Sequence, residues 1–238
     1  VVASLYLIDR DTTHIPQTII NGSNSSHPDS GSVVYFIDGE DTTSVLCGLT
    51  ITGGTGTPYN LDGNWYRCGG GVFGESAGVK LIRNLIIHNR IISDGATGGG
   101  LAVLNNAPFF QYVIIEDNHI SDNFLRANSI TTGGAGGGIT IWDLSSGGIS
   151  SRITGNVFER DTIFATHWAV GGGLSVVKYQ ATGALPEVYL QSNIFRANIL
   201  NGTNYLADGA GIFLSWTAES IIQENLFENN VATTTYGQ

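Results

Sequence analysis

Short runs of alternating apolar and polar residues recur along the chain, and each run follows a group of glycines. Glycine triplets stand at 69–71, 98–100, 136–138 and 171–173, and Gly-Ala-Gly stands at 209–211. The next residues read VFG, LAV, ITI, LSV and IFL, the period-2 pattern of strands with one buried side. The third residues of these groups are 29, 38, 35 and 38 positions apart, so the chain is built from repeats of one unit.

A second pattern, Asn-x-(Ile/Phe)-x-x-(Asn/Asp), follows each glycine group. Its five copies begin at Asn84, Asn118, Asn156, Asn193 and Asn225 and end at Asn89, Asn123, Asp161, Asn198 and Asn230. Amide side chains at equivalent turns of stacked repeats can form hydrogen-bonded ladders. We also expect two inward-facing apolar ladders: Ile86, Ile120, Phe158, Phe195 and Phe227, and Val72, Leu101, Ile139, Leu174 and Ile212.

Strands of three to five residues cannot bury an apolar face alone, but stacked coils share one continuous interior. The sequence therefore predicts an all-β fold, a parallel β-helix, and the general preference of parallel crossovers makes it right-handed. A β-propeller has a similar repeat length but needs four strands and hairpin turns per unit, and this repeat shows too few strands.

The whole chain, 1–238, is predicted to be a single β-helix domain. Residues 1–46 lack glycine triplets and are expected to form the N-terminal coils, with strands at Leu5–Ile8, Thr18–Ile20 and Val33–Ile37. Residues 47–238 form the repeated coils, and the turn-rich segment Thr55–Arg67 is expected to be a surface loop. No capping element follows the last repeat. We expect that the chain is part of a longer protein or that its open end stacks on another subunit.

These motifs resemble those of known β-helix proteins. Gly48-Leu-Thr-Ile-Thr-Gly-Gly, the GGG(L/I/V) units and the FxxN sequences Phe195–Asn198 and Phe227–Asn230 are similar to repeats of the pectate-lyase-like class. Within that class they resemble polymorphic outer-membrane adhesins of autotransporter type and large secreted bacterial surface proteins. The likeness covers roughly residues 45–238. It implies a β-helix on the cell surface or outside the cell, and it does not single out one activity.

Composition limits the classes of partner that the chain could bind, but it does not decide whether the two cysteines are bonded. A net charge of -10 argues against nucleic acid, and no apolar stretch approaches the length of a membrane helix. Cys47 and Cys68 are either two buried thiols or one disulfide, because 21 residues is a plausible single coil that would stack them. Few lysines and many Asn and Thr suggest an extracellular chain, in which a disulfide would persist. Glycosylation sequons begin at Asn21, Asn24 and Asn201.

The candidate binding residues lie just after the glycine triplets. Trp142, Tyr179 and Trp216 are expected near one lateral edge of three successive coils, where aromatic rings could stack on sugars or pack under neighbouring loops. Asp143 and Lys178 share a register one coil apart, and we interpret them as a surface ion pair. This edge is the predicted carbohydrate-contact site.

Catalytic and metal-binding patterns are weak. The acidic candidates Asp94, Asp143, Asp208 and Glu219 do not share one register, and no two carboxylates stand two residues apart within a strand. The five histidines lack metal-ligand spacing, so no metal site is predicted; calcium is possible but no motif supports it.

The sequence thus favours a non-catalytic extracellular module for adhesion, carbohydrate contact or structural assembly. Two alternatives stay open: a polysaccharide-degrading enzyme, more readily a lyase than a hydrolase, acting at the Trp142 edge, and a filament subunit that associates end to end.

Overall fold

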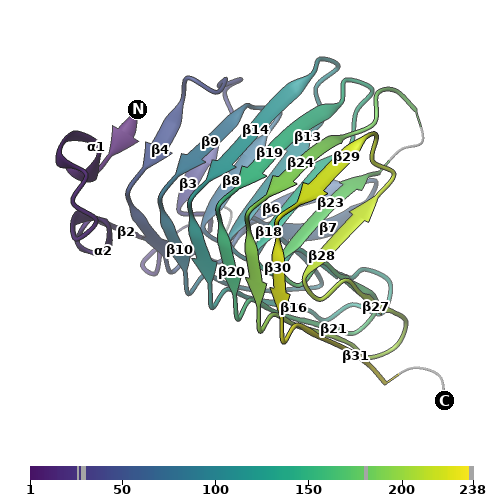
Figure 1. Cartoon of the computed structure of the whole chain (residues 1–238). Coiled ribbons are helices and arrows are strands. Elements are labelled where there is room, and N and C mark those ends of the chain that lie inside the picture. The colour runs from purple at the N-terminus through teal and green to yellow at the C-terminus, as the bar shows by residue number, and fades with distance from the viewer. Residues whose placement is uncertain (26, 28–30, 180–181, 236–238) are drawn as a thin grey trace.

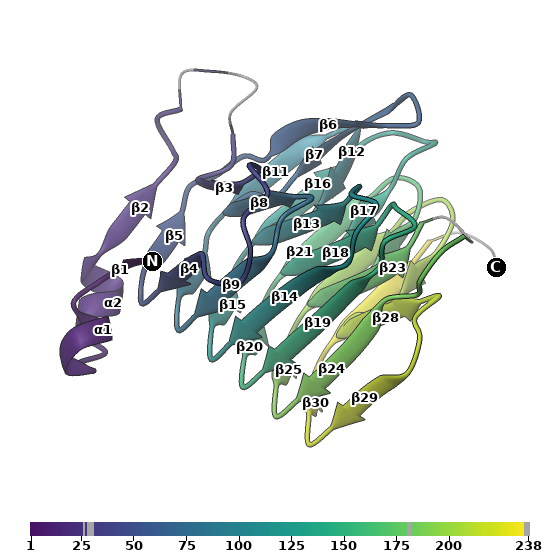
Figure 2. The ribbon, with the colours of Figure 1, turned by 90° about the horizontal axis from the view of Figure 1, so that it is seen from above.

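The computed structural model is a column of about six stacked coils, with 51% of residues in strands and 3% in helices. It describes residues 1–25, 27, 31–179 and 182–235. Each complete coil passes through five short strands, one in each of five sheets that run the length of the column (Figures 1 and 2). All pairings between coils are parallel, so the predicted parallel β-helix is confirmed.

The sheets are named A to E here, and their strands are given in spatial order. Sheet A holds β1 (Val2–Ala3), β4 (Val45–Cys47), β9 (Val79–Ile82), β14 (Gln111–Glu116), β19 (Ile149–Thr154), β24 (Glu187–Gln191) and β29 (Ser220–Gln223). Sheet B holds β2 (Ile19–Asn21), β5 (Thr50–Thr52), β10 (Leu85–Ile87), β15 (His119–Ser121), β20 (Val157–Glu159), β25 (Ile194–Arg196) and β30 (Leu226–Glu228).

The other three sheets complete each turn. Sheet E holds β11 (Arg90–Ser93), β16 (Phe124–Ala127), β21 (Thr162–Ala165), β26 (Ile199–Gly202) and β31 (Val231–Thr234). Sheet D holds β27 (Ala207–Asp208), β22 (Ala169–Val170), β17 (Gly134–Ala135), β12 (Gly95–Thr97), β7 (Asn64–Cys68) and β6 (Thr57–Leu61). Sheet C holds β28 (Ile212–Ser215), β23 (Leu174–Lys178), β18 (Ile139–Asp143), β13 (Leu101–Asn105), β8 (Val72–Glu75) and β3 (Val34–Phe36).

Both predicted apolar ladders are confirmed by strand register. On sheet B each member of the first ladder pairs with the next one along successive coils, in the order Ile86, Ile120, Phe158, Phe195 and Phe227. The three phenylalanine rings stack nearly parallel, with centroids 4.5 and 5.0 Å apart. On sheet C the second ladder runs from Val72 to Ile212. These side chains form the central core between sheets A, B and C, and only the last coil leaves its phenylalanine, Phe227, partly exposed.

The asparagines form two ladders, one at each corner of sheet B. Asn118, for example, donates from Nδ2 to Asn156 Oδ1 at 3.1 Å and to the Leu81 carbonyl at 3.0 Å, and its backbone N–H also binds Asn156 Oδ1. The residue before each ladder position has a positive φ, as in Asp117 (55°) and Asp122 (56°). The buried amides therefore satisfy the backbone groups that each sharp turn leaves unpaired.

Asp161 occupies one step of the ladder between sheets B and E, where the other copies have Asn. Its Oδ1 accepts from Asn123 Nδ2 at 2.9 Å and from the Asn123 N–H at 3.0 Å, as an amide oxygen would. Its Oδ2 is buried and has no partner among the described residues. Complete burial raises the pKa of Asp161 well above its ordinary value.

The glycine triplets make the bend from sheet D to sheet C. The first glycine of each has a positive φ, for example 63° at Gly98. The middle glycine lies against the next coil, because a Cβ on Gly99 would stand 2.2 Å from the Gly137 carbonyl oxygen. The repeat therefore needs glycine at both positions, as the sequence pattern indicates.

Two local predictions were wrong. Leu5–Ile8 is not a strand: α1 (Tyr6–Asp9) occupies it and, with α2 (His14–Gln17), packs Tyr6 and Ile15 against Cys47 outside the first coils. Thr55–Arg67 is not a loop, because β6 and β7 form an antiparallel hairpin there. The hairpin turns at Asp62-Gly63, both with positive φ, and Asp-Gly between strands is a hairpin signal that the sequence already contained.

The two cysteines are free and buried, so the disulfide alternative is wrong. Cys47 lies on β4 in sheet A and Cys68 on β7 in sheet D. One full coil separates ladder neighbours by 32 to 38 residues, so a step of 21 reaches a different wall instead of the same one. Among the described residues, no helix is long and apolar enough to cross a membrane.

Candidate functional site

Sheets C and D face each other at an angle outside the central core, and apolar side chains fill the wedge between them. Phe73, Ala102 and Leu104 point into it from sheet C, and Cys68, Ala135 and Val170 from sheet D. At the N-terminal side the β6–β7 hairpin closes the wedge: its Tyr66 meets Trp142 edge to face, with ring centroids 5.4 Å apart. Burial raises the pKa of Tyr66 to about 12.

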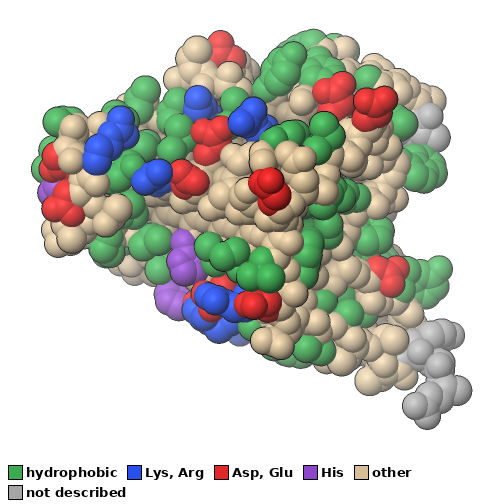
Figure 3. Space-filling view, viewed as in Figure 1, with side chains coloured by type: hydrophobic (Ala, Val, Ile, Leu, Met, Phe, Trp, Pro, Cys, Tyr) green, Lys and Arg blue, Asp and Glu red, His purple; other side chains and the backbone are tan. Residues whose placement is uncertain are grey.

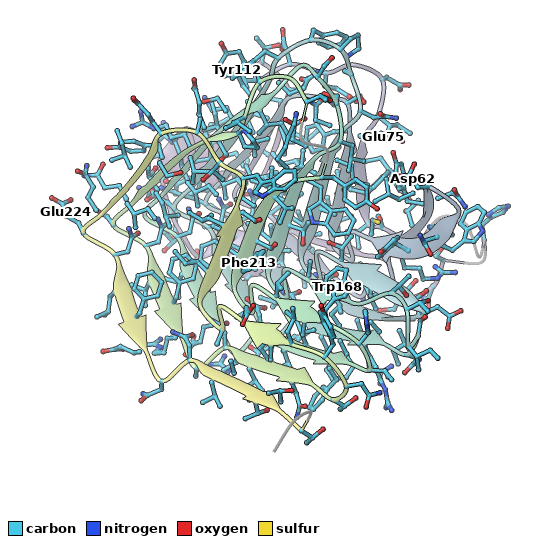
Figure 4. The ribbon with its side chains drawn as sticks, turned by 90° about the vertical axis from the view of Figure 1, so that its right-hand side faces the viewer. Asp62, Glu75, Tyr112, Trp168, Phe213 and Glu224 are labelled. Atoms are coloured by element: carbon cyan, nitrogen blue, oxygen red, sulfur yellow. The ribbon has the colours of Figure 1, made fainter. Side chains whose placement is uncertain are left out.

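Beyond the hairpin the wedge opens into a cleft of about 260 Å³ along the last three described coils. Its walls are almost entirely apolar, and we call it the aromatic cleft. It is lined chiefly by Trp142, Trp168, Tyr179, Tyr205, Phe213 and Asp208. Figure 4 shows Trp168 and Phe213 close to each other in the angle between sheets C and D. Five aromatic rings from three coils thus converge on one hollow.

The outermost rings of the cleft are accessible. Tyr205 is 56% exposed and Tyr179 is 41% exposed. Neither phenol hydroxyl forms a hydrogen bond with another described residue. One face of Tyr205 is covered by the His167 ring, with centroids 4.9 Å apart. The tyrosines therefore present apolar faces together with free polar groups, the combination found in pockets that orient a polar ligand.

The structure brings together part of the predicted carbohydrate edge. Trp142 and Tyr179 lie in the cleft with ring centroids 6.4 Å apart. Trp216 does not line it: it follows β28, has a positive φ of 53° and is 56% exposed. The sequence missed Trp168 and Tyr205, which lie on loops outside the repeat motifs. Phe213 stands at an outward position two residues after the glycine group, so the register could have identified it.

Asp143 and Lys178 are not a surface pair, and this prediction is corrected. Both side chains are 0% exposed, and Lys178 Nζ donates to Asp143 Oδ2 at 2.8 Å. The ammonium also donates to the Ser145 carbonyl, and Asn105 Nδ2 donates to Asp143 Oδ1 at 3.2 Å. Register alone placed the pair correctly on adjacent strands, and strand alternation puts both side chains on the inner face of sheet C with Ile141 and Val176.

Several charged groups elsewhere form exposed ion pairs between adjacent coils. Arg160 forms two hydrogen bonds of 2.8 Å with Asp122 and lowers the pKa of that carboxyl group, and Arg196 contacts Glu159 at 3.0 Å. Figure 3 shows basic, acidic and histidine side chains side by side on the lower part of this face. Such exposed pairs contribute little to stability.

The acidic candidates do not converge. Asp94 lies between β11 and β12, Asp143 is buried on β18, Asp208 ends β27 at the cleft, and Glu219 precedes β29 near sheet A. Within the described residues, no three His, Cys, Asp or Glu side chains are grouped as metal ligands.

No protein-family model, no curated protein and no solved structure matches the chain.

Proposed function

We propose that this chain is a non-catalytic β-helical module that contacts carbohydrate through the aromatic cleft, as part of an adhesive or structural protein outside the cell. The observation that carries the proposal is the convergence of five aromatic rings on an open, apolar hollow. A contiguous exposed apolar hollow often marks an interaction site.

The shape and polarity of the cleft suit sugar rings. A pyranose has apolar C–H faces and a rim of hydroxyl groups, so it can stack on aromatic faces while hydrogen-bonding to polar groups at their edges. Tyr179 and Tyr205 offer both features at the mouth of the cleft. The deeper Trp142, which is only 4% exposed, gives these rings a rigid floor.

The arrangement of charges favours a binding module over a lyase. A lyase acting at this edge would need Asp143 and Lys178 to reach the substrate, but the two groups bind each other in the interior. The likeness of the GGG and FxxN repeats to secreted and surface-bound β-helix proteins supports placement outside the cell.

Binding can be tested by isothermal titration calorimetry with a panel of neutral, anionic and amino-sugar oligosaccharides. We expect millimolar to micromolar affinity for at least one class. Tyr205→Ala should weaken that affinity at least about tenfold, whereas Trp216→Ala, which removes an equally exposed aromatic ring outside the cleft, should leave it unchanged. Absence of binding to the whole panel, or equal losses in the two variants, would contradict the proposal.

The enzyme alternative has its own test. Incubation with uronate polymers, with and without calcium, should give no increase in absorbance from unsaturated products. Such an increase would favour a lyase. Self-association through the coil ends stays a prediction, and sedimentation of the same samples tests it.

A further inference from the structure

We infer that the aromatic cleft selects cationic sugars, specifically oligosaccharides of protonated amino sugars, over neutral or acidic ones. This inference rests on the proposed carbohydrate contact and adds the charge of the ligand. Its basis is the single carboxylate in the lining, Asp208, set among five aromatic rings with no Lys or Arg in the described walls of the cleft.

Asp208 is available to a ligand. It ends β27 at the outer edge of sheet D, and its side chain is exposed. It forms no ion pair or side-chain hydrogen bond with another described residue, unlike Asp122 and Asp143, whose carboxylates are held by Arg160 and Lys178. An ammonium group entering the cleft would therefore not have to displace an internal cation.

The aromatic walls of the cleft also favour a cationic ligand. The faces of Trp, Tyr and Phe carry negative electrostatic potential and attract cations, most strongly where water is excluded. Lys178, which directly precedes Tyr179 in the chain, is fully buried and engaged by Asp143. His167 lies behind Tyr205, stacked on one face of that ring. The chain as a whole carries a net charge of -10, which favours approach of a cationic polymer and opposes that of a polyuronate.

The test compares oligosaccharides of equal length: β-1,4-linked glucosamine, its fully N-acetylated form with the same linkage, and α-1,4-linked galacturonate as the anionic ligand. Titrations are made at low salt and at a pH at which the amine is protonated. We expect the glucosamine oligomer to bind about five- to tenfold more tightly than the acetylated one, and galacturonate to bind most weakly. Raising the salt concentration should reduce the preference, because it depends on charge.

Asp208→Asn removes the carboxylate with little change in shape and should bring the affinities for the two glucosamine-based oligomers within about twofold of each other. Glu219→Gln makes the same change of charge at an exposed site outside the cleft lining and should preserve the preference. If the neutral oligomer binds as well as the cationic one, or if Asp208→Asn weakens both equally, the charge selection is wrong while carbohydrate contact stands. If none of the three ligands binds, the charge selection is wrong, and binding to the wider oligosaccharide panel then decides whether the proposed function stands.

Discussion

The corners of sheet B repeat the same contacts from coil to coil, whereas the wedge between sheets C and D is filled by different side chains in each coil. At the corners every complete coil repeats the same turn: a residue with a positive φ is followed by a buried side chain that hydrogen-bonds to the next coil, and this side chain is an amide at every step except Asp161. In the wedge each coil contributes different side chains, from Phe73 near the hairpin to Phe213 in the cleft. Repetition maintains the column, and variation on the outer side of the same coils creates the aromatic cleft.

The polar groups buried inside the column also differ from one place to another. The ladders bury amides, which supply both donors and acceptors to adjacent coils. The inner face of sheet C buries a charged pair, Lys178 and Asp143, which follows the core residues Ile141 and Val176 and occurs in one coil step only. A ladder amide in the middle of the column hydrogen-bonds to the coils on both sides, whereas the ion pair has no counterpart in the neighbouring coils.

The largest expected effect comes from breaking that pair. Lys178→Met leaves the Asp143 carboxylate buried without its cation and should lower the free energy of unfolding by about 3–5 kcal/mol. Adding Asp143→Leu should recover part of the loss, because no unpaired charge then remains buried. Denaturant titration of the two variants checks this, and equal stability of the single and double variants would contradict the role assigned to the pair.

The next effect tests the close approach of the coils. Gly99→Ala places a Cβ 2.2 Å from the Gly137 carbonyl oxygen and should cost about 3 kcal/mol, since the backbone must shift. Ala210 stands at the equivalent position of the last glycine group, with no described coil beyond it. Ala210→Gly is the matched control and should change the unfolding free energy by less than about 1 kcal/mol. Similar losses in both variants would show that contact between coils is not what excludes a side chain.

A smaller effect concerns the one ladder step that departs from the repeat. Because the folded-state pKa of Asp161 is raised, its neutral form contributes full stability only below the unfolded value, near pH 4. That contribution is lost as the pH rises toward the folded-state pKa. Asp161→Asn supplies the missing Nδ2 donor and should stabilise the fold by about 1–3 kcal/mol at neutral pH.

Unfolding midpoints measured from pH 4 to pH 9 test this explanation. The advantage of Asp161→Asn should be smallest at pH 4 and grow with pH. Asn156→Asp places a carboxyl group at a comparable step of the other ladder and should introduce the same kind of pH dependence. Parallel pH profiles for all three proteins would mean that the unpartnered Oδ2 of Asp161 does not control stability.

The sequence determined the repeat, its two ladders and its glycine bends, because each coil imposes the same steric and hydrogen-bonding demands on the same position. Asn84 and Ile86 could be placed by pattern alone for that reason, and the hairpin at Asp62-Gly63 had a local signal that was missed. Strand alternation also places Asp143 and Lys178 on the inner face, a signal that was missed. Only the tertiary structure decided that the cysteines lie on different walls and that Trp168 and Tyr205 join Trp142 in a cleft. These outcomes depend on how non-repeating segments fold over the outside of the column, and no periodic pattern specifies contacts that each coil makes only once.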